Sequence, residues 1–130
     1  HQQNPTTGYN IKGDPAGKID LEALCRAMGF NRVRVVDPNQ LKEMDRVLKE
    51  ELAAEEPSVI ITRSPCVMLK DVPKAPPLKV DADKCNGCSL CMRIGCPALS
   101  LRDGKAEIDR TQCIGCQVCM QMCHRNALIV

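Results

Sequence analysis

Eight cysteines in the last third of the chain restrict its possible folds more than any other feature. They form two runs, Cys85-x2-Cys88-x2-Cys91-x4-Cys96-Pro97 and Cys113-x2-Cys116-x2-Cys119-x3-Cys123. Two intervening residues let successive cysteine side chains turn toward one body, and a cuboidal cluster needs one thiolate at each of its four iron corners. The spacing therefore predicts two [4Fe-4S] clusters and a role in electron transfer.

The fourth ligand of each cluster cannot come from its own triplet of closely spaced cysteines. In two-cluster ferredoxins, which this spacing resembles, the last cysteine of each run binds the opposite cluster, and a Cys-Pro ending is typical. We therefore predict cluster 1 on Cys85, Cys88, Cys91 and Cys123, and cluster 2 on Cys113, Cys116, Cys119 and Cys96. Gly87 and Gly115 lack a Cβ, which predicts a close approach of backbone to each cluster.

Two other uses of cysteine fit the pattern less well. Paired Cys-x2-Cys motifs also build zinc sites, but those have no use for a third cysteine two residues later. A disulfide framework belongs to secreted chains, and the chain does not open with a charged region followed by an apolar one. Free thiols and oxygen-sensitive clusters favour the cytoplasm, and no apolar stretch approaches the roughly 20 residues of a membrane span.

Composition excludes one class of partner and bounds the charge. With one Tyr, one Phe and no Trp, the chain lacks the aromatic platforms on which single-stranded nucleic acids stack, so we expect no nucleic-acid partner. From Lys79 onward, seven Lys and Arg face five Asp and Glu, but two oxidised clusters with their thiolates change this +2 to about −2. Such a weak charge favours a permanently docked module over an electrostatically steered carrier.

The order of local patterns divides the 130 residues into two parts joined by a linker. In residues 1–69, apolar periodicity predicts helices at 21–28 and 41–52 and strands at 32–36 and 58–62. Two short apolar strands with a crossover helix indicate a buried parallel sheet. Because two strands leave an edge and much apolar surface open, this part is interpreted as the tail of a larger α/β domain. Residues 70–77, with three prolines, are the predicted linker.

Residues 78–130 contain all eight cysteines of the two runs. Strands are predicted at 78–81, 98–102, 105–108 and 127–130, with a hairpin turn at Asp103-Gly104 and short helices near Cys91 and Met120. This order predicts a βαββαβ unit and an α+β chain overall. So small a core needs cluster binding to supply much of its folding free energy.

Three further residues have chemistry but no partner in the sequence. Cys25 lies on the apolar stripe of its helix and is interpreted as a small core side chain. Cys66 follows a strand, but no His or acidic residue accompanies it, which favours a structural role. His124 stands where ferredoxins usually place proline; a solvated imidazole is the simpler interpretation, and a hydrogen bond to the cluster is the alternative.

The whole order of features resembles the carboxy-terminal part of the thiamine-diphosphate subunit of indolepyruvate ferredoxin oxidoreductases. The likeness is carried by the segments 21–29, 32–38, 58–61 and 63–66, followed by the cysteine runs with Cys96-Pro97-Ala98-Leu99. It implies that residues 1–69 are the tail of a thiamine-diphosphate-binding domain. The cysteine spacing of ferredoxins is shared with many electron-transfer proteins, so the match is made specific by this preceding segment and by the lengthened gap of four residues between Cys91 and Cys96.

The resemblance implies an oxygen-sensitive enzyme of anaerobes that oxidatively decarboxylates indolepyruvate and other aryl pyruvates to acyl-coenzyme A. Electrons from thiamine diphosphate chemistry would pass through the two clusters to an external ferredoxin. The partners would be the remainder of the thiamine subunit and a smaller second subunit. The family's Gly-Asp-Gly motif and downstream Asn, which hold Mg²⁺ and the diphosphate, have no counterpart here, since Gly13-Asp14-Pro15 has the wrong third residue. No catalytic residue is therefore predicted in this chain, only electron transfer.

Two alternatives remain open from the sequence. One is a free-standing dicluster ferredoxin with an unusual amino-terminal extension. The other is an interaction module that uses metal only to hold its fold together.

Overall fold

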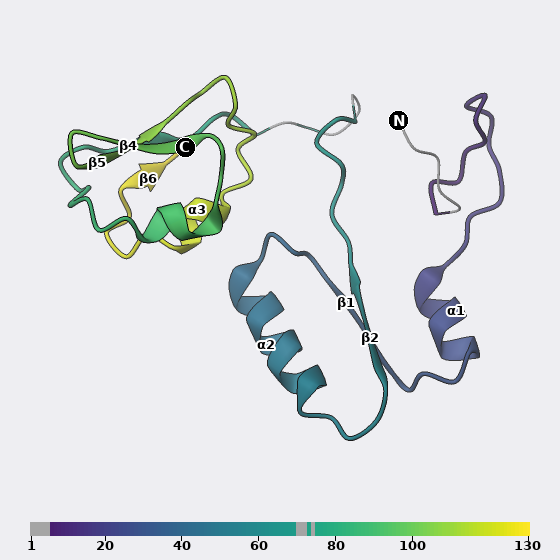
Figure 1. Ribbon diagram of the computed structural model, residues 1–130. Coiled ribbons are helices and arrows are strands. Elements are labelled where there is room, and N and C mark those ends of the chain that lie inside the picture. The colour runs from purple at the N-terminus through teal and green to yellow at the C-terminus, as the bar shows by residue number, and fades with distance from the viewer. Residues whose placement is uncertain (1–5, 70–72, 74) are drawn as a thin grey trace. The chain divides into compact units, whose positions relative to one another are not determined.

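The computed structural model describes residues 6–69, 73 and 75–130, and these form two compact units (Figure 1). The first unit comprises the chain up to Pro38 together with Lys42–Arg63, and the second comprises Asn39–Leu41 and Ser64–Val130. Much of the predicted linker, residues 70–72 and 74, lies outside the described residues. The boundaries 1–69, 70–77 and 78–130 therefore stay a prediction.

The first unit contains a two-stranded parallel sheet with one crossover helix. Strand β1 (Arg32–Val36) pairs with β2 (Ser58–Thr62) from Arg32 opposite Ser58 to Val36 opposite Thr62, and helix α2 (Leu41–Leu52) connects them. Helix α1 (Leu21–Ala27) precedes β1 and begins at Asp20, whose carboxylate accepts hydrogen bonds from two backbone N–H groups of the first turn. Both helices and both strands are confirmed.

Much apolar surface of the first unit is open, as the sequence analysis expected for two strands alone. Val33, Val36 and Val47 are the buried apolar residues of this unit, while four of the five residues of β2 are half-buried. Helix α1 buries none of its residues, and Leu24 and Met28 of its apolar stripe are 44% and 62% exposed. Two strands and two helices cannot cover both faces of a sheet, and the larger domain to which this part is predicted to belong stays a prediction.

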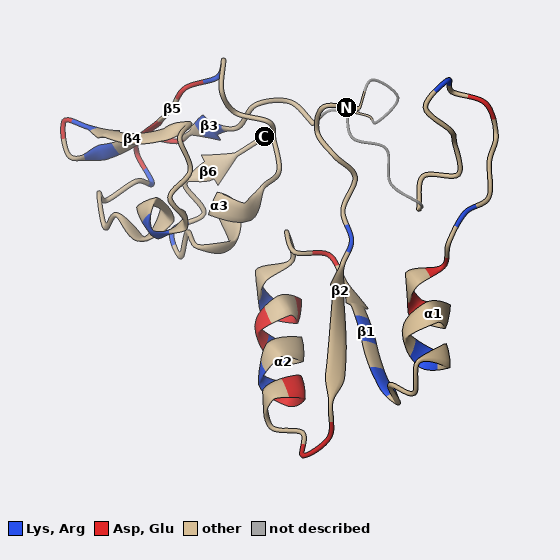
Figure 2. Cartoon of the chain, turned by 45° about the vertical axis from the view of Figure 1, so that its right-hand side comes forward, with Lys and Arg blue, Asp and Glu red and all other residues tan. Residues whose placement is uncertain are grey.

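A charged cluster attaches α2 to β1. The Glu51 carboxylate is 1% exposed and pairs with Arg32 Nε at 2.8 Å and Arg34 Nε at 2.9 Å. Hydrogen bonds from these two guanidinium groups lower the pKa of Glu51 to about 2. Acidic and basic residues alternate along α2 (Figure 2), and exposed pairs form within the helix between Arg46 and both Glu43 and Glu50 and between Asp45 and Lys49.

The second unit has the predicted βαββαβ order. Strand β3 (Lys79–Val80) pairs antiparallel with β6 (Leu128–Ile129), and β4 (Leu99–Arg102) forms a hairpin with β5 (Lys105–Ile108). A 3₁₀ helix, η1 (Leu90–Ile94), follows the first three cysteines of one run, and helix α3 (Val118–Gln121) occupies the same place in the other. Asp103 and Gly104 both adopt positive φ, as a two-residue hairpin turn requires.

The two cysteine runs begin with the same turn, 28 residues apart. Asp81 and Asp109 each accept, through the side chain, a hydrogen bond from a backbone N–H two residues later, and their backbone carbonyls accept from Cys85 N–H and Cys113 N–H, each at 3.0 Å. Their own N–H groups reach across the unit, Asp81 to Ala127 O at 2.7 Å and Asp109 to Ala98 O at 2.8 Å. The second unit is therefore an internal repeat related by an approximate two-fold.

The core of the second unit is built partly from the cysteines themselves. Its buried residues in mutual contact are Leu78, Cys91, Cys119 and Leu128, with half-buried Val80, Leu99 and Ile108 packed around them. Two of the four central side chains are thus predicted ligands. Among the described residues, no helix is long and apolar enough to cross a membrane.

Candidate metal centres

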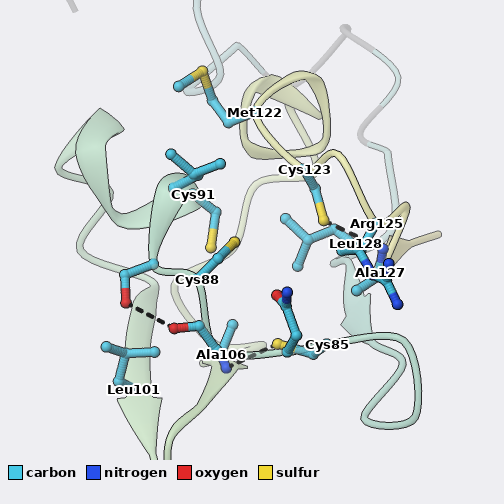
Figure 3. Close-up of a pocket in the computed structure, with 14 residues that line it drawn as sticks. Cys85, Cys88, Cys91, Leu101, Ala106, Met122, Cys123, Arg125, Ala127 and Leu128 are labelled. Atoms are coloured by element: carbon cyan, nitrogen blue, oxygen red, sulfur yellow. Dashed lines mark hydrogen bonds between the residues drawn. The ribbon is translucent and has the colours of Figure 1, made fainter.

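Four cysteines from both runs surround one pocket of the second unit. The pocket is lined by Cys85, Cys88, Cys91 and Cys123, and their side chains point into it from the first cysteine loop, η1 and the end of α3 (Figure 3). Leu101, Ala106, Ala127 and Leu128 supply its apolar wall. These four cysteines are the set that the sequence predicted for cluster 1, including the crossed ligand Cys123.

The four sulfur atoms of this pocket lie around it rather than at one point (Figure 3). Among the described residues, no three His, Cys, Asp or Glu side chains converge closely enough to hold a single ion. A cubane, which presents a separate iron to each thiolate, needs such a spread of donors.

The second predicted set also lies together. Negative charge on Cys116, Cys113 and Cys96 acts on the buried Cys119, as the three remaining thiols of the first set act on Cys91. Both groupings join three cysteines of one run to the last cysteine of the other. The structure therefore brings together the four cysteines predicted for cluster 1 and the four predicted for cluster 2.

Burial opposes ionisation of the central thiol in each set. Desolvation raises the pKa of Cys119 to about 11, and it also raises the pKa of Cys91. Loss of the proton from these two buried thiols is therefore unfavourable unless a cation binds to the thiolate that forms. Iron bound at the site would supply that positive charge, which couples metal binding to the packing of the core.

Backbone N–H groups donate to three sulfur atoms of the predicted ligands. The Leu78 N–H donates to Cys113 Sγ at 3.5 Å, and its repeat equivalent, the Ala106 N–H, donates to Cys85 Sγ at 3.4 Å. The Ala127 N–H donates to Cys123 Sγ at 3.3 Å. These donors lower the cost of placing negative charge on the sulfur, and the bond from Ala106 lowers the pKa of Cys85.

Gly87 and Gly115 have a more specific role than the sequence indicated. Both have positive φ, and a Cβ on Gly87 would lie 2.0 Å from the carbonyl oxygen of Gly104. A Cβ on Gly115 would lie 2.7 Å from the carbonyl oxygens of Ala75 and Pro76. In each repeat, glycine therefore lets the cysteine loop pass directly under another stretch of backbone.

The remaining cysteines and the histidine lie outside both sets. Cys25 is half-buried and Cys66 is exposed, and neither joins a group of metal-binding side chains in the described part of the chain. His124 is exposed beside Cys123. The sequence analysis missed the donors Leu78, Ala106 and Ala127, although the 28-residue period of the cysteines relates the first two.

Comparison with known proteins decides the nature of this unit. Residues 77–124 match the model of the 4Fe-4S dicluster domain. This part of the chain is a 4Fe-4S dicluster domain. The dicluster domain accounts for two [4Fe-4S] clusters, and its limits enclose all eight cysteines of the two runs.

The chain is also similar to a subunit of one class of enzyme. It is 34% identical over 128 residues to the indolepyruvate oxidoreductase subunit IorA of Methanothermobacter thermautotrophicus, a match that covers 98% of this chain. It is 38% identical over 105 residues, 75% of this chain, to the IorA subunit of Pyrococcus abyssi. The chain spans about a fifth of the length of these relatives, 21% and 16% respectively. The longer match includes the first unit as well as the dicluster domain.

Proposed function

We propose that this chain is the electron-transfer part of an indolepyruvate ferredoxin oxidoreductase. The observation that carries the proposal is that a single match to the IorA subunit extends over 98% of the chain, so the first unit and the dicluster domain occur in the same order in one relative. A dicluster domain by itself would indicate electron transfer without indicating an enzyme. The match of the first unit to the same subunit is what links the electron-transfer domain to an enzyme.

We assign cluster 1 to Cys85, Cys88, Cys91 and Cys123, and cluster 2 to Cys113, Cys116, Cys119 and Cys96. The shared pocket supports the first set, and the electrostatic grouping around Cys119 supports the second. Each cluster, when bound, accepts and releases single electrons. The chain contributes the thiolates, the N–H groups directed at sulfur and an apolar wall that limits water at the site.

Thiamine diphosphate would bind outside this chain. The only Gly-Asp pair near the start lies in a turn in which Asn10 Oδ1 accepts from Asp14 N–H at 3.0 Å, and Pro15 stands where the motif needs glycine. Asp14 is engaged with the Asn10 side chain at 3.1 Å. These residues do not fit a Mg²⁺-diphosphate site, so we place that site on the remainder of the subunit, with a smaller second subunit and an external ferredoxin as further partners.

Exposed apolar side chains of the first unit support this division. Leu24 of α1, Met28 directly after α1, and Leu52 at the end of α2 are 44%, 62% and 82% exposed. Apolar side chains at helical spacing normally cover a core, so these positions fit an α/β thiamine domain whose other elements lie elsewhere. Because the clusters are oxygen-sensitive and need reduced thiols, we expect the protein to function in the cytoplasm.

The test has two independent measurements on the anaerobically reconstituted chain. About eight iron and eight sulfide per chain, with an EPR signal from two coupled clusters after reduction, are expected for two [4Fe-4S] clusters. Cys88→Ser should lower the iron content or alter the EPR signal, whereas Cys66→Ser, at an equally exposed cysteine outside both sets, should change neither. Fewer than five iron atoms, or an equal effect of Cys66→Ser, would contradict the ligand assignment.

Association separates the enzyme part from a free-standing ferredoxin. If the first unit completes a larger domain, the chain should bind the remaining segment of a co-expressed IorA-type subunit and coelute with it in gel filtration. The free-standing ferredoxin would be favoured if the chain is a monodisperse monomer that does not bind this segment. In that case the first unit should also be compact and protected from proteolysis.

A further inference from the structure

The internal repeat lets the surroundings of the two clusters be compared position by position. Residues 28 apart occupy equivalent places, so Ala106 donates to Cys85 as Leu78 donates to Cys113. The residue before each donor is then also equivalent: it is Lys105 beside cluster 1 and Pro77 beside cluster 2. Each site serves as the reference for the other.

A lysine charge is therefore placed at one cluster and absent at the equivalent position of the other. Lys105 is attached to the first cysteine loop, because its Nζ donates to the carbonyl oxygen of Ala82 at 2.6 Å. Ala82 lies three residues before the predicted ligand Cys85 in that loop, so this contact keeps the ammonium group near the ligand. Pro77 offers cluster 2 no charge and no side-chain donor.

A second cation lies at the same pocket. Arg125 lines the pocket of cluster 1, two residues after the crossed ligand Cys123, whereas Pro97 and Ala98 follow the crossed ligand of cluster 2. Within the described part of the chain, neither Lys105 nor Arg125 forms an ion pair, while the neighbouring Lys84 is neutralised by Asp81 at 2.8 Å. Cluster 1 therefore has two uncompensated positive charges at its edge.

Hydrogen bonds act in the same direction as these charges. Two ligands of cluster 1, Cys85 and Cys123, accept backbone N–H groups, against one ligand of cluster 2 in the residues described. The two sets do not differ in burial, since each has one buried, one exposed and two half-buried cysteines. Nearby charge and hydrogen bonds to sulfur are among the factors that set cluster potentials, and both favour extra negative charge on cluster 1.

We propose that cluster 1 has the higher reduction potential and holds the electron when the domain is reduced by one electron, with Lys105 and Arg125 setting this order. The inference rests on the proposed cluster ligands. One electron from a low-potential reductant changes one cluster from the 2+ to the 1+ state, with no bond broken and no proton required. The first electron resides on cluster 1 and the second enters cluster 2.

The test is an anaerobic redox titration of the full reconstituted chain with dithionite, followed by EPR. Two one-electron steps are expected, separated by at least tenfold in the reduction equilibrium, about 59 mV. Cys88→Ser and Cys116→Ser are exposed, repeat-equivalent substitutions that mark the clusters. Cys88→Ser should alter the first step and Cys116→Ser the second. Coincident steps, or the first step altered by Cys116→Ser, would overturn the order.

Charge variants test the cause of the order. The double variant Lys105→Gln with Arg125→Gln should make the first step at least tenfold less favourable and bring it toward the second. Pro77→Lys, which places a cation beside cluster 2, should make the second step more favourable. Arg110→Gln is the matched control, because it removes an exposed cation three residues before Cys113 and should leave the first step in place.

A wrong ligand assignment and a wrong charge effect give different results. If the reconstituted chain binds fewer than five iron atoms, the ligand assignment is wrong and the proposed order of the two clusters is rejected with it. If loading is complete but the charge variants leave the first step unchanged, or if Arg110→Gln shifts it equally, the ligands stand and the proposed role of Lys105 and Arg125 is rejected.

Discussion

Single residues in the dicluster domain are constrained by backbone as much as by metal. Gly87 has a φ of +72°, and the space that a side chain would need is filled by the carbonyl of Gly104. Gly104 has nearly the same conformation, at +75°, but nothing lies within 4 Å of its would-be Cβ. These two glycines therefore separate the cost of the left-handed conformation from the cost of a clash.

Substitution of both glycines by alanine should show this difference. Gly104→Ala is expected to cost about 1–2 kcal/mol, the penalty for an L-residue in the left-handed region. Gly87→Ala adds a contact at 2.0 Å with backbone, so it should cost more and should also lower cluster loading. Iron content and thermal unfolding under anaerobic conditions measure both effects. Equal losses in the two variants would show that conformation alone requires glycine at position 87.

At the scale of elements, the attachment of α2 to β1 depends on a buried carboxylate. Glu51 has its pKa lowered to about 2 by hydrogen bonds from Arg32 and Arg34, from an ordinary value near 4.5. A carboxylate with a lowered folded-state pKa stabilises the fold fully above its unfolded pKa. This contribution is lost as the pH falls from about 4.5 toward 2.

Neutralising this carboxylate should loosen the first unit at neutral pH. In Glu51→Gln, amide hydrogen exchange of Val33 and Val36, measured by NMR on the full chain, is expected to accelerate at least tenfold, because two guanidinium groups lose their buried partner. Glu43→Gln is the control, since Glu43 forms an exposed pair with Arg46 on the same helix. Comparable exchange in the two variants would contradict a special role for Glu51.

Local patterns were sufficient to predict the elements, because each had a sharp signal. Asp20 capped α1, the Asp103-Gly104 pair specified the hairpin, and the apolar spacing of α2 set its bounds. Burial was harder to predict, since the stripe of α1 has the pattern of a packed face but is exposed in the described unit. An apolar pattern records which side of a helix is covered, and the covering segment need not belong to the same stretch of sequence.

The candidate site was predictable for a different reason. Cysteine spacing identified which thiols gather, because chain geometry leaves few ways to surround a cluster. The N–H donors Leu78 and Ala127 have no side-chain signature, and nothing in the sequence indicated that Gly87 and Gly115 pass beneath other backbone segments. Backbone interactions of this kind depend on tertiary folding, which residue types do not record.

At the scale of the whole molecule, the two units should differ in their dependence on iron. The dicluster domain has a core of four central side chains, of which Cys91 and Cys119 are proposed ligands, whereas the buried residues Val33, Val36 and Val47 of the first unit have no proposed role in metal binding. We therefore expect loss of metal to lower the stability of the dicluster domain and to leave the stability of the first unit unchanged.

Removal of iron with a chelator should therefore unfold the dicluster domain selectively. We expect the amides of Val80 and Leu128, which pair in β3 and β6, to lose protection from hydrogen exchange, while those of β1 and β2 keep theirs. The control is the same treatment followed by anaerobic reconstitution, which should restore protection. Retention of the β3–β6 pair without iron would show that apolar packing alone maintains this domain.

The crossed ligands also bear on how the protein is made. With the ligands proposed above, cluster 1 needs Cys123, the last cysteine of the second run, and cluster 2 needs Cys96 from the first run. A nascent chain that has emerged only as far as Gly95 would then offer three thiolates and no complete site. Under this assignment neither centre can be completed before Cys119 has been synthesised, so iron and sulfide would have to be delivered after most of both runs has been translated.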